Sequence, residues 1–423
     1  MGNFHLFLLC ILALNFVLDS VLKSVAFQSD DTTTTQISNH FNVVEVSSLL
    51  PTSTCNPSSK QDFLFGLNYV VSSEEEEESL ELVHNYGPCS PKNHGKANAP
   101  SMLEILDRDQ KRASLMVSRQ RYGKNQVQLR WQDSTYVINV GIGTPKRMFT
   151  FNIDTGYTQC VSSSCTYLGA YLDGSLIFGY MAKETLFVGS KTFKGIMFGC
   201  NEVTFNATLD KTDGIIGLGQ GFLSFVEQTS NTYNKVFSYC LPSNPNRVGF
   251  LRFGKTKQVS KSLKFTKLGR DNAIELTGIK VGSTTIPITV KKDTAFIDSG
   301  TVITRLPSKD YIKLREAYRK AMTGYSFVGA ISVADTCYNV GDHKKLKLPK
   351  MSFLFEDGLV LNIPPSGVVI PYNSTVVCFP FAATPETPGG EDFVLLGNYQ
   401  QKTLEVVYDV AGGKLGFGHG GCK

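Results

Sequence analysis

Short apolar runs, many with hydrophobic and polar positions alternating and most ended by glycine, fill the chain from about residue 136 onward. Alternation with a period of two is typical of half-buried β-strands, and glycines mark the turns between them. Residues 136–140 and 149–153 are predicted to form two strands joined by a turn at residues 143–145. Long stretches with helical periodicity are few. The pattern therefore predicts a mostly β protein.

Two segments depart from this pattern and predict helices. Ser101 and Glu104 have the spacing of a capping box, and good helix formers follow as far as Val117. A second helix is predicted over residues 307–322, with Ser308 as its N-cap. Its apolar face would carry Tyr311, Leu314, Tyr318 and Ala321.

An apolar strand that ends in Asp, a small hydroxyl residue and glycine occurs twice, at residues 151–156 and 295–300. Each copy predicts a strand that delivers a carboxylate, Asp154 or Asp298, to a tight turn. If the turns face each other, the two carboxylates cannot both ionise cheaply, so they share a proton. A single copy is also an ordinary turn, but the repeated context favours an acid and a base in one catalytic site.

The order of elements around the two Asp turns is also repeated. A glycine-bordered apolar strand at residues 213–219 has a counterpart at residues 393–398. In the first half, residues 171–175 are predicted to form the tip of a hairpin. Internal duplication is the simplest account, and it predicts two β lobes that each contribute one Asp.

The N-terminal quarter of the chain has a different composition. Residues 6–18 are apolar but too short to span a bilayer, and a small-x-small pattern follows, so residues 1–26 are predicted to be a signal peptide. Residues 27–125 are polar and charged, and they are predicted to be a prosegment, with a disordered linker as the alternative. The basic cluster at residues 108–130 lies near an acidic run at residues 74–78, which favours a solvated, removable region.

Charge and hydropathy exclude some partners. The net charge of +5 is small for 423 residues and gives no sign of a nucleic-acid partner. No later stretch is apolar enough for a membrane helix, so we expect an exported protein with no stable membrane insertion. The sequons at Asn206 and Asn373 agree with export and predict two glycosylation sites.

The cysteines indicate an oxidising compartment. Cys10 lies in the predicted signal peptide, and Cys55 and Cys89 lie in the polar region, which leaves an odd set of seven in the body of the chain. Their spacing is not that of a zinc site, so structural disulfides are the better interpretation. Within the C-terminal half, we expect a bridge between Cys337 and Cys378.

The ordered set of motifs resembles the pepsin-like aspartic proteases, and most closely the plant nepenthesin-type branch. The motifs that carry the resemblance are 140–145, 153–156, 198–200, 213–219, 237–240, 296–305 and 395–398, together with 44–50 and 84–89 of the predicted prosegment. The resemblance implies a bilobal fold of two β-barrel-like lobes with the active site between them. The lobes would comprise residues 126–260 and 261–423.

The same resemblance implies an aspartic-type endopeptidase with no cofactor and no metal. Asp154 and Asp298 would hold a water between them, one carboxylate taking its proton while the other protonates the scissile carbonyl oxygen. The residues implied to support them are Thr155, Gly156, Ser299, Gly300 and Thr301, and Tyr171 would be the tyrosine of a flap over the substrate. Protein or peptide substrates, activity at acidic pH, a monomer, and secretion to the apoplast or delivery to the vacuole are further expectations.

The first lobe departs from the family pattern. Tyr171 lies only 17 positions after Asp154, whereas three strands with their turns need roughly 20 residues or more. The N-terminal lobe is therefore expected to be shortened. Tyr157 replaces a serine that would hydrogen-bond the first carboxylate, Leu172 replaces a glycine beside the flap tyrosine, and the only tryptophan, Trp131, precedes the motif.

These departures leave alternatives to the protease open. A catalytically impaired relative could act as a cleft-binding or inhibitor module, and a mis-spliced gene product would also explain the shortened lobe. Other enzyme classes are disfavoured, because the six histidines show neither Ser/His/Asp nor metal-site spacing. The glycines at 214, 217 and 219 border a predicted buried strand rather than a nucleotide site.

Overall fold

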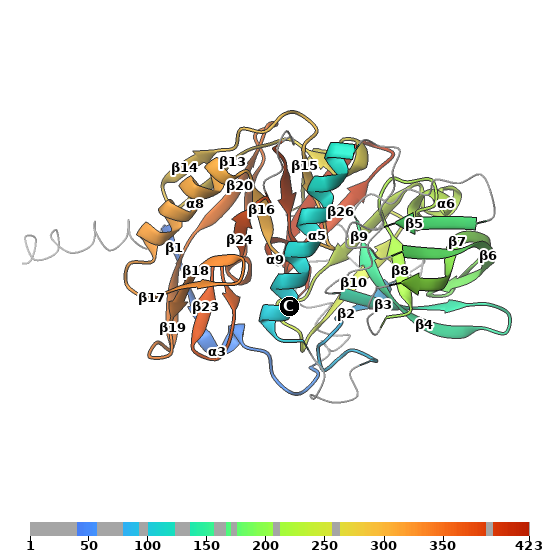
Figure 1. Cartoon of the computed structure of the whole chain (residues 1–423), viewed down its shortest axis with the longest axis horizontal. Helices are drawn as coiled ribbons and strands as arrows, with labels where there is room; N and C mark the ends of the chain where they lie inside the picture. Colours follow the sequence, from blue (N-terminus) through green and yellow to red (C-terminus); the bar gives the residue numbers. More distant parts are fainter. Residues whose placement is uncertain are drawn as a thin grey trace, which may run out of the picture.

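The computed structural model describes residues 40–56, 79–92, 100–122, 136–155, 166–170, 176–205, 212–255, 263–385 and 392–422. Strands dominate these residues, so the mostly β prediction is confirmed. Figure 1 shows two groups of strands on opposite sides of the molecule, with a long helix between them. The predicted signal peptide lies outside the described residues.

The largest sheet joins both halves of the chain. Its main path runs β11 (Lys264–Lys267), β27 (Lys414–His419), β26 (Leu404–Asp409), β9 (Val236–Cys240), β10 (Val248–Phe253), β2 (Ser79–His84), β3 (Tyr136–Ile142), β4 (Arg147–Asp154) and β8 (Gly214–Gly217). Since the path includes strands from the N-terminal region and from both predicted lobes, the sheet is a common base for the two halves.

A ribbon of one short strand and two long strands also belongs to the first half. It consists of β5 (Thr166–Ala170), β6 (Leu176–Val188) and β7 (Lys191–Phe205). Ala170 of β5 stands opposite Leu176 of β6, so these strands form the hairpin expected from the sequence. The hairpin tip, residues 171–175, lies outside the described residues, and Tyr171 with it.

The second half contains three further sheets. The first has the order β12 (Ala273–Ile274), β15 (Ala295–Ile297), β25 (Val394–Leu396), β16 (Thr304–Leu306), β24 (Phe381–Ala383). The second is β14 (Thr284–Pro287), β13 (Leu276–Val281), β20 (Met351–Phe355), β21 (Val360–Asn362). The third is β17 (Ser326–Ile331), β18 (Ala334–Asn339), β23 (Val376–Cys378), β22 (Ile370–Pro371). Together they enclose most of the apolar core of this half.

Strand pairing confirms the internal duplication. β4 pairs in parallel with β8, and Ile153 stands opposite Ile216. β15 pairs in the same way with β25, where Ile297 stands opposite Leu396. Each Asp turn thus leaves the end of a buried strand that is held by the glycine-bordered strand found in the sequence.

The two predicted helices are present. α5 (Met102–Tyr122) begins with the expected capping box, because the Glu104 backbone N donates to Ser101 Oγ and the Ser101 backbone N donates to the Glu104 carboxylate. α8 (Ser308–Ala321) is N-capped by Pro307 rather than by Ser308. The correction follows from the backbone, since the Tyr311 N–H already donates to the Pro307 carbonyl and places Ser308 inside the first turn. Short helices are α3 (Val46–Leu49), α6 (Phe225–Gln228), α7 (Ser230–Tyr233) and α9 (Asn398–Gln401).

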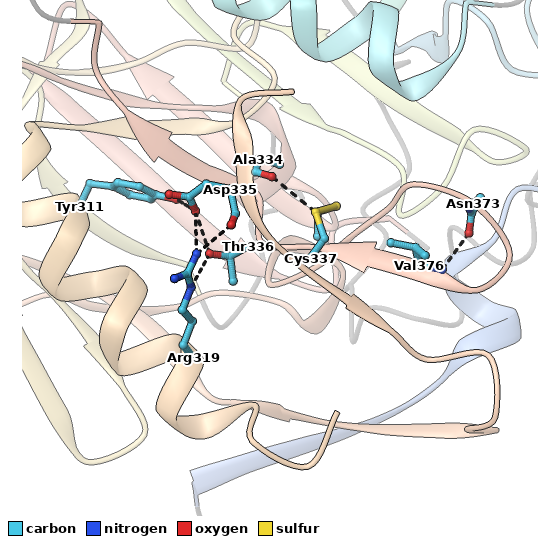
Figure 2. Close-up of a disulfide and its surroundings, with 9 residues drawn as sticks. Tyr311, Arg319, Ala334, Asp335, Thr336, Cys337, Asn373 and Val376 are labelled. Carbon is cyan, nitrogen blue, oxygen red and sulfur yellow. Dashed lines mark hydrogen bonds and ion pairs between the residues drawn. A yellow bond between two sulfur atoms is a disulfide. The ribbon is translucent and has the colours of Figure 1, made fainter. Parts of the chain in front are cut away.

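Three disulfides cross-link the described residues. Cys337 of β18 and Cys378 of β23 stand opposite each other and are joined, as expected from the sequence. Figure 2 shows this bridge near Asp335, which accepts a hydrogen bond from Tyr311 of α8. The other pairs are Cys55–Cys89 and Cys240–Cys422. Cys200 is free and exposed, and Cys160 and Cys165 lie outside the described residues.

The N-terminal region is built into this fold, so the expectation of a solvated region is wrong for the described part of it. β1 (Phe41–Glu45) pairs with β19 (Lys345–Pro349) of the second half. β2 lies between β10 and β3 inside the large sheet. α5 runs between the two groups of strands in Figure 1. Leu82 of β2 and Leu106 of α5 are fully buried, so apolar burial outweighs the charged composition here.

No helix in the described part of the chain combines the length and the apolar character needed to cross a membrane.

His84 makes the stability of this arrangement depend on pH. Its ring packs against Tyr136 at 5.7 Å between centroids, and its Nδ1 accepts a hydrogen bond from the Tyr86 backbone N. Burial, together with the nearby Lys402 charge, lowers the pKa of His84 from 6.5 to about 3. Between pH 6.5 and about 3, His84 is therefore protonated in the unfolded chain and neutral in the folded chain. The stability of the folded chain falls as the pH falls through this range.

Between pH 6.5 and about 3 we expect the full chain to lose about 1.4 kcal/mol of stability per pH unit because of His84. His84→Asn keeps an acceptor for the Tyr86 N–H but cannot be protonated, so its urea unfolding midpoint should depend less on pH. His40→Asn, at an exposed position, is the control and should behave like the wild type. Equal pH dependence in the wild type and His84→Asn would contradict the assignment.

Candidate active site

The two Asp turns meet through their hydroxyl residues. The Ser299 backbone N donates to Thr155 Oγ1 at 2.9 Å, and the Thr155 backbone N donates to Ser299 Oγ at 3.3 Å. Both residues are fully buried. This reciprocal pair holds the turns face to face at the ends of β4 and β15, and it brings Asp154 and Asp298 into one site.

Asp298 is held by its own turn. The Gly300 backbone N donates to its Oδ1 at 2.8 Å, and Thr301 Oγ1 donates to its Oδ2 at 2.7 Å. Its backbone N donates to the Leu396 carbonyl of β25. These contacts fix the carboxylate orientation before any ligand arrives.

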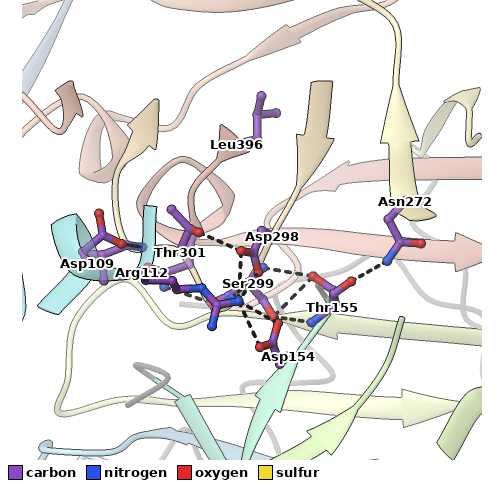
Figure 3. A network of polar contacts seen from close by, with 12 residues as sticks. Asp109, Arg112, Asp154, Thr155, Asn272, Asp298, Ser299, Thr301 and Leu396 are labelled. Carbon is purple, nitrogen blue, oxygen red and sulfur yellow. Dashed lines mark hydrogen bonds and ion pairs between the residues drawn. The ribbon is translucent and has the colours of Figure 1, made fainter. Parts of the chain in front are cut away.

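A guanidinium from α5 lies on both carboxylates. Arg112 Nη2 is 2.9 Å from Asp154 Oδ2 and 3.1 Å from Asp298 Oδ2, and it also lies within hydrogen-bond distance of the other oxygen of each group. Figure 3 shows the side chain reaching from α5 to the point between the two turns. The Arg112, Asp154 and Asp298 side chains are 11%, 14% and 2% exposed. One nitrogen thus occupies the point where both carboxylates converge.

Glycine at position 300 makes this approach possible. A Cβ there would lie 2.6 Å from Arg112 Nη2 and 3.0 Å from Asp154 Oδ1. Contacts this short are not tolerated, so any side chain at position 300 would displace the guanidinium or the opposite carboxylate. The glycine of the second Asp turn therefore serves close approach as well as the bend itself.

Charge neutralisation sets the protonation of the pair. Burial alone would raise the pKa of Asp298, but the Arg112 charge and the hydrogen bonds from Thr301 and Gly300 lower it below 3.8. Burial disfavours the charged form of Arg112, while the two carboxylates raise its pKa well above its usual range. Both ion pairs are therefore stable at neutral pH, and the Asp298 pair weakens only as the pH falls through the lowered pKa.

Three buried amide side chains hydrogen-bond the backbone of the two turns; Asn398 ends one of the motifs found in the sequence, whereas Asn272 and Gln401 were not predicted to take part. Asn272 Nδ2 donates to the Thr155 carbonyl at 2.6 Å, Asn398 Nδ2 donates to the Ser299 carbonyl at 3.0 Å, and Gln401 Nε2 donates to the Asp298 carbonyl at 3.3 Å. All three are buried. Amides from distant segments thus satisfy the carbonyls of both turns.

A second ion pair, also involving α5, was not predicted from the sequence. Asp109 of α5 accepts from Arg305 Nη2 of β16 at 2.7 Å, and both side chains are 0% exposed. Asp109 also accepts from the Val302 backbone N. The available signal was the spacing of Leu106, Asp109 and Arg112, three residues apart along one predicted helix face.

Several predicted site residues are not placed by the structure. Gly156, Tyr157, Tyr171 and Leu172 lie outside the described residues, as does the sequon at Asn206. Asn373 is described and lies on an exposed turn before β23 (Figure 2). Within the described ranges, no group of three or more His, Cys, Asp or Glu residues is arranged to hold a metal ion.

Comparison with known proteins identifies the family. Residues 157–255 match a family model described as xylanase inhibitor N-terminal, and residues 273–419 match one described as xylanase inhibitor C-terminal. Aspartyl protease AED1 of Arabidopsis thaliana is 32% identical, over 90% of this chain and 92% of its own length. The chain belongs to the plant family of pepsin-like aspartic proteases. Aspartic proteinase nepenthesin-1 of Nepenthes gracilis is 26% identical over 69% of this chain and 78% of its own length.

The comparisons also bear on fold and on length. The basic 7S globulin from soybean is 17% identical and superposes with a TM-score of 0.57 over 67% of this chain and 92% of its own. This similarity shows that the two proteins share a fold. The alignment with an Arabidopsis thaliana aspartyl protease family protein, 32% identical over 90% of this chain and 93% of the other, spans 456 positions. Because this chain has only 423 residues, the relative carries residues that have no counterpart here.

We expect Arg112→Met to destabilise the packing of α5 by about 3 kcal/mol at pH 7, because two buried carboxylates lose their counterion. The loss should shrink near pH 4, where the carboxylates can share a proton. Hydrogen exchange of the α5 amides in the full chain measures the effect. Lys111→Met, which removes a charge from an exposed position of the same helix, is the control. Unchanged α5 protection in Arg112→Met would show that the guanidinium does not hold the helix.

Proposed function

We propose that this protein is an aspartic-type endopeptidase that hydrolyses peptide bonds in protein or peptide substrates. The observation that carries the proposal is the convergence of Asp154 and Asp298 on one nitrogen, Arg112 Nη2. With the arginine withdrawn, a water at that point contacts both carboxylates. One carboxylate takes its proton as it attacks, and the other protonates the scissile carbonyl oxygen. The mechanism requires one shared proton and therefore acidic pH.

The full chain is then a zymogen whose prosegment includes α5. The Arg112 guanidinium fills the water position and keeps both carboxylates ionised, so neither step can occur. Acidification weakens the Asp298 pair by protonation below its lowered pKa. The loss of stability from His84, which the unfolded chain protonates more readily than the folded chain, begins at a higher pH, below about 6.5. Release of the prosegment in an acidic compartment follows from these two effects.

Export is part of the same proposal. A signal peptide at residues 1–26 and three disulfides suit an oxidising route to the apoplast or the vacuole. The exposed turn at Asn373 is accessible to the glycosylation machinery. Action as a monomer is proposed because both Asp residues come from one chain.

Acid treatment of the purified full chain should produce cleavage of a denatured protein substrate, and a statine-type inhibitor should block it. Asp298→Asn should lower the rate by at least three orders of magnitude, because the amide cannot exchange the proton. Asp335→Asn, at a carboxylate on β18, is the matched control and should keep the activity. Activity that survives in Asp298→Asn would disprove the mechanism.

A second candidate function is supported by the family models, whose descriptions name xylanase inhibitors. In that case the protein would bind another protein, such as a glycoside hydrolase, through its surface without cutting it. The departures at Tyr157 and Leu172 and the short stretch after Asp154 motivate this candidate. Tight binding of a xylanase by the acid-treated chain, with no cleavage of any protein substrate, would favour it over the protease.

A further inference from the structure

Arg305 is a fully buried arginine whose hydrogen bonds are made mainly to α5. Its guanidinium donates to the Asp109 carboxylate at 2.7 Å and to the Gln110 side-chain oxygen, both on the helix. Among the described residues, its Nη1 also lies 3.5 Å from the Ala383 carbonyl of β24. Asp109 is the one carboxylate recorded within 4 Å of it among the described residues. Departure of α5 therefore leaves Arg305 without its counterion.

A charged group in this position needs a replacement partner. Arg305 Nε already has no hydrogen-bond partner among the described residues. An unpaired buried charge is strongly unfavourable, and a planar guanidinium with spare donors matches a carboxylate in geometry and charge. Once α5 has left, the surface that it covered exposes a cation ready for an anionic partner.

Arg305 also lies within reach of a substrate bound at the Asp pair. It stands opposite Leu395 of β25, which in turn stands opposite Phe296 of β15, two residues before Asp298. Two strand spacings are about 10 Å, and an extended peptide covers about 3.3 Å per residue. A substrate that crosses the Asp pair therefore reaches Arg305 about three residues from its scissile bond.

The contacts of α5 indicate how a substrate would lie on the surface that the helix covers. Leu106, Asp109 and Arg112 are successive positions on the buried face of α5. Leu106 packs in an apolar cluster with Val302 and Ala382, Asp109 meets Arg305, and Arg112 meets the Asp pair. The surface under α5 thus changes from apolar, to cationic, to anionic over two helical turns.

We propose that Arg305 is a specificity-determining residue that binds the carboxylate of a substrate Asp or Glu about three residues from the scissile bond. Asp109 occupies this subsite in the full chain. This inference rests on the proposed endopeptidase function. It assigns the enzyme a preference for acidic peptides, which the two catalytic carboxylates would not by themselves provide.

The test uses the acid-activated protein and peptide pairs in which Asp or Glu is exchanged for Asn or Gln at each of four positions on either side of the cleaved bond. At one position, kcat/KM should be about tenfold or more higher for the acid than for the amide, mainly through KM. The preference should fall below about pH 4, where the substrate carboxyl protonates.

Arg305→Met should abolish this preference while it keeps cleavage of the amide peptides. Because the single variant leaves Asp109 buried without its cation, the Asp109→Asn/Arg305→Met pair serves as a second variant that removes both charges. Arg315→Met, which removes an arginine paired with Asp335 on the side of α8, is the matched control and should keep the preference. No acid preference in the wild type, or an undiminished preference in both Arg305 variants, would overturn the proposal.

Failure of the endopeptidase proposal is distinguishable from failure of this one. If no peptide is cut, a second experiment uses a variant of the full chain with a cleavage site for an added protease at residue 125. This variant is cut at that site, and the binding of a free peptide of residues 100–114 to the cut protein is measured. Peptide with Asp109 should bind about tenfold or more tighter than peptide with Asn at that position. Equal binding would overturn the role of Arg305 whether or not the protein is an enzyme.

Discussion

The arrangement of the whole site depends on one cation placed between two like charges. Two carboxylates buried this closely repel each other unless they share a proton or a positive group neutralises them. The Arg112 guanidinium does so in the full chain. As a result, both Asp turns, the hydroxyl pair of Thr155 and Ser299, and helix α5 are held in a single arrangement from both halves of the molecule.

The contacts of α5 are complementary in charge to the surface beneath it. Asp109 of the helix pairs with the buried Arg305. Arg112 of the helix pairs with Asp154 and Asp298. Neither pair could be lost singly without leaving an unpaired charge in the interior. The helix therefore binds by satisfying charges as much as by covering the apolar cluster around Leu106.

Much of the fold could be predicted from local pattern, because strand alternation, the capping box at Ser101 and the repeated Asp turns are short-range signals. The duplication predicted the repeated order of the Asp turns and the glycine-bordered strands, while the parallel pairing of Ile153 with Ile216 became visible only in the structure. The contacts of Arg112, Asp109 and Asn272 could not be predicted, because they depend on segments brought together only by the folded chain. Charge composition was misleading for residues 79–92 and 100–122, since a few buried side chains decide whether a polar segment packs.

The position of β2 inside the large sheet matters for what happens to that sheet if the N-terminal region is removed. β2 pairs with β10 on one side and with β3 on the other, so both neighbours use it as a hydrogen-bonding partner. If this strand is removed with the rest of the N-terminal region, two open strand edges face each other inside a sheet, and open edges recruit other chains. If the N-terminal region is removed as proposed, the shortened chain would have to keep or regain this sheet without the strand that joins β10 to β3.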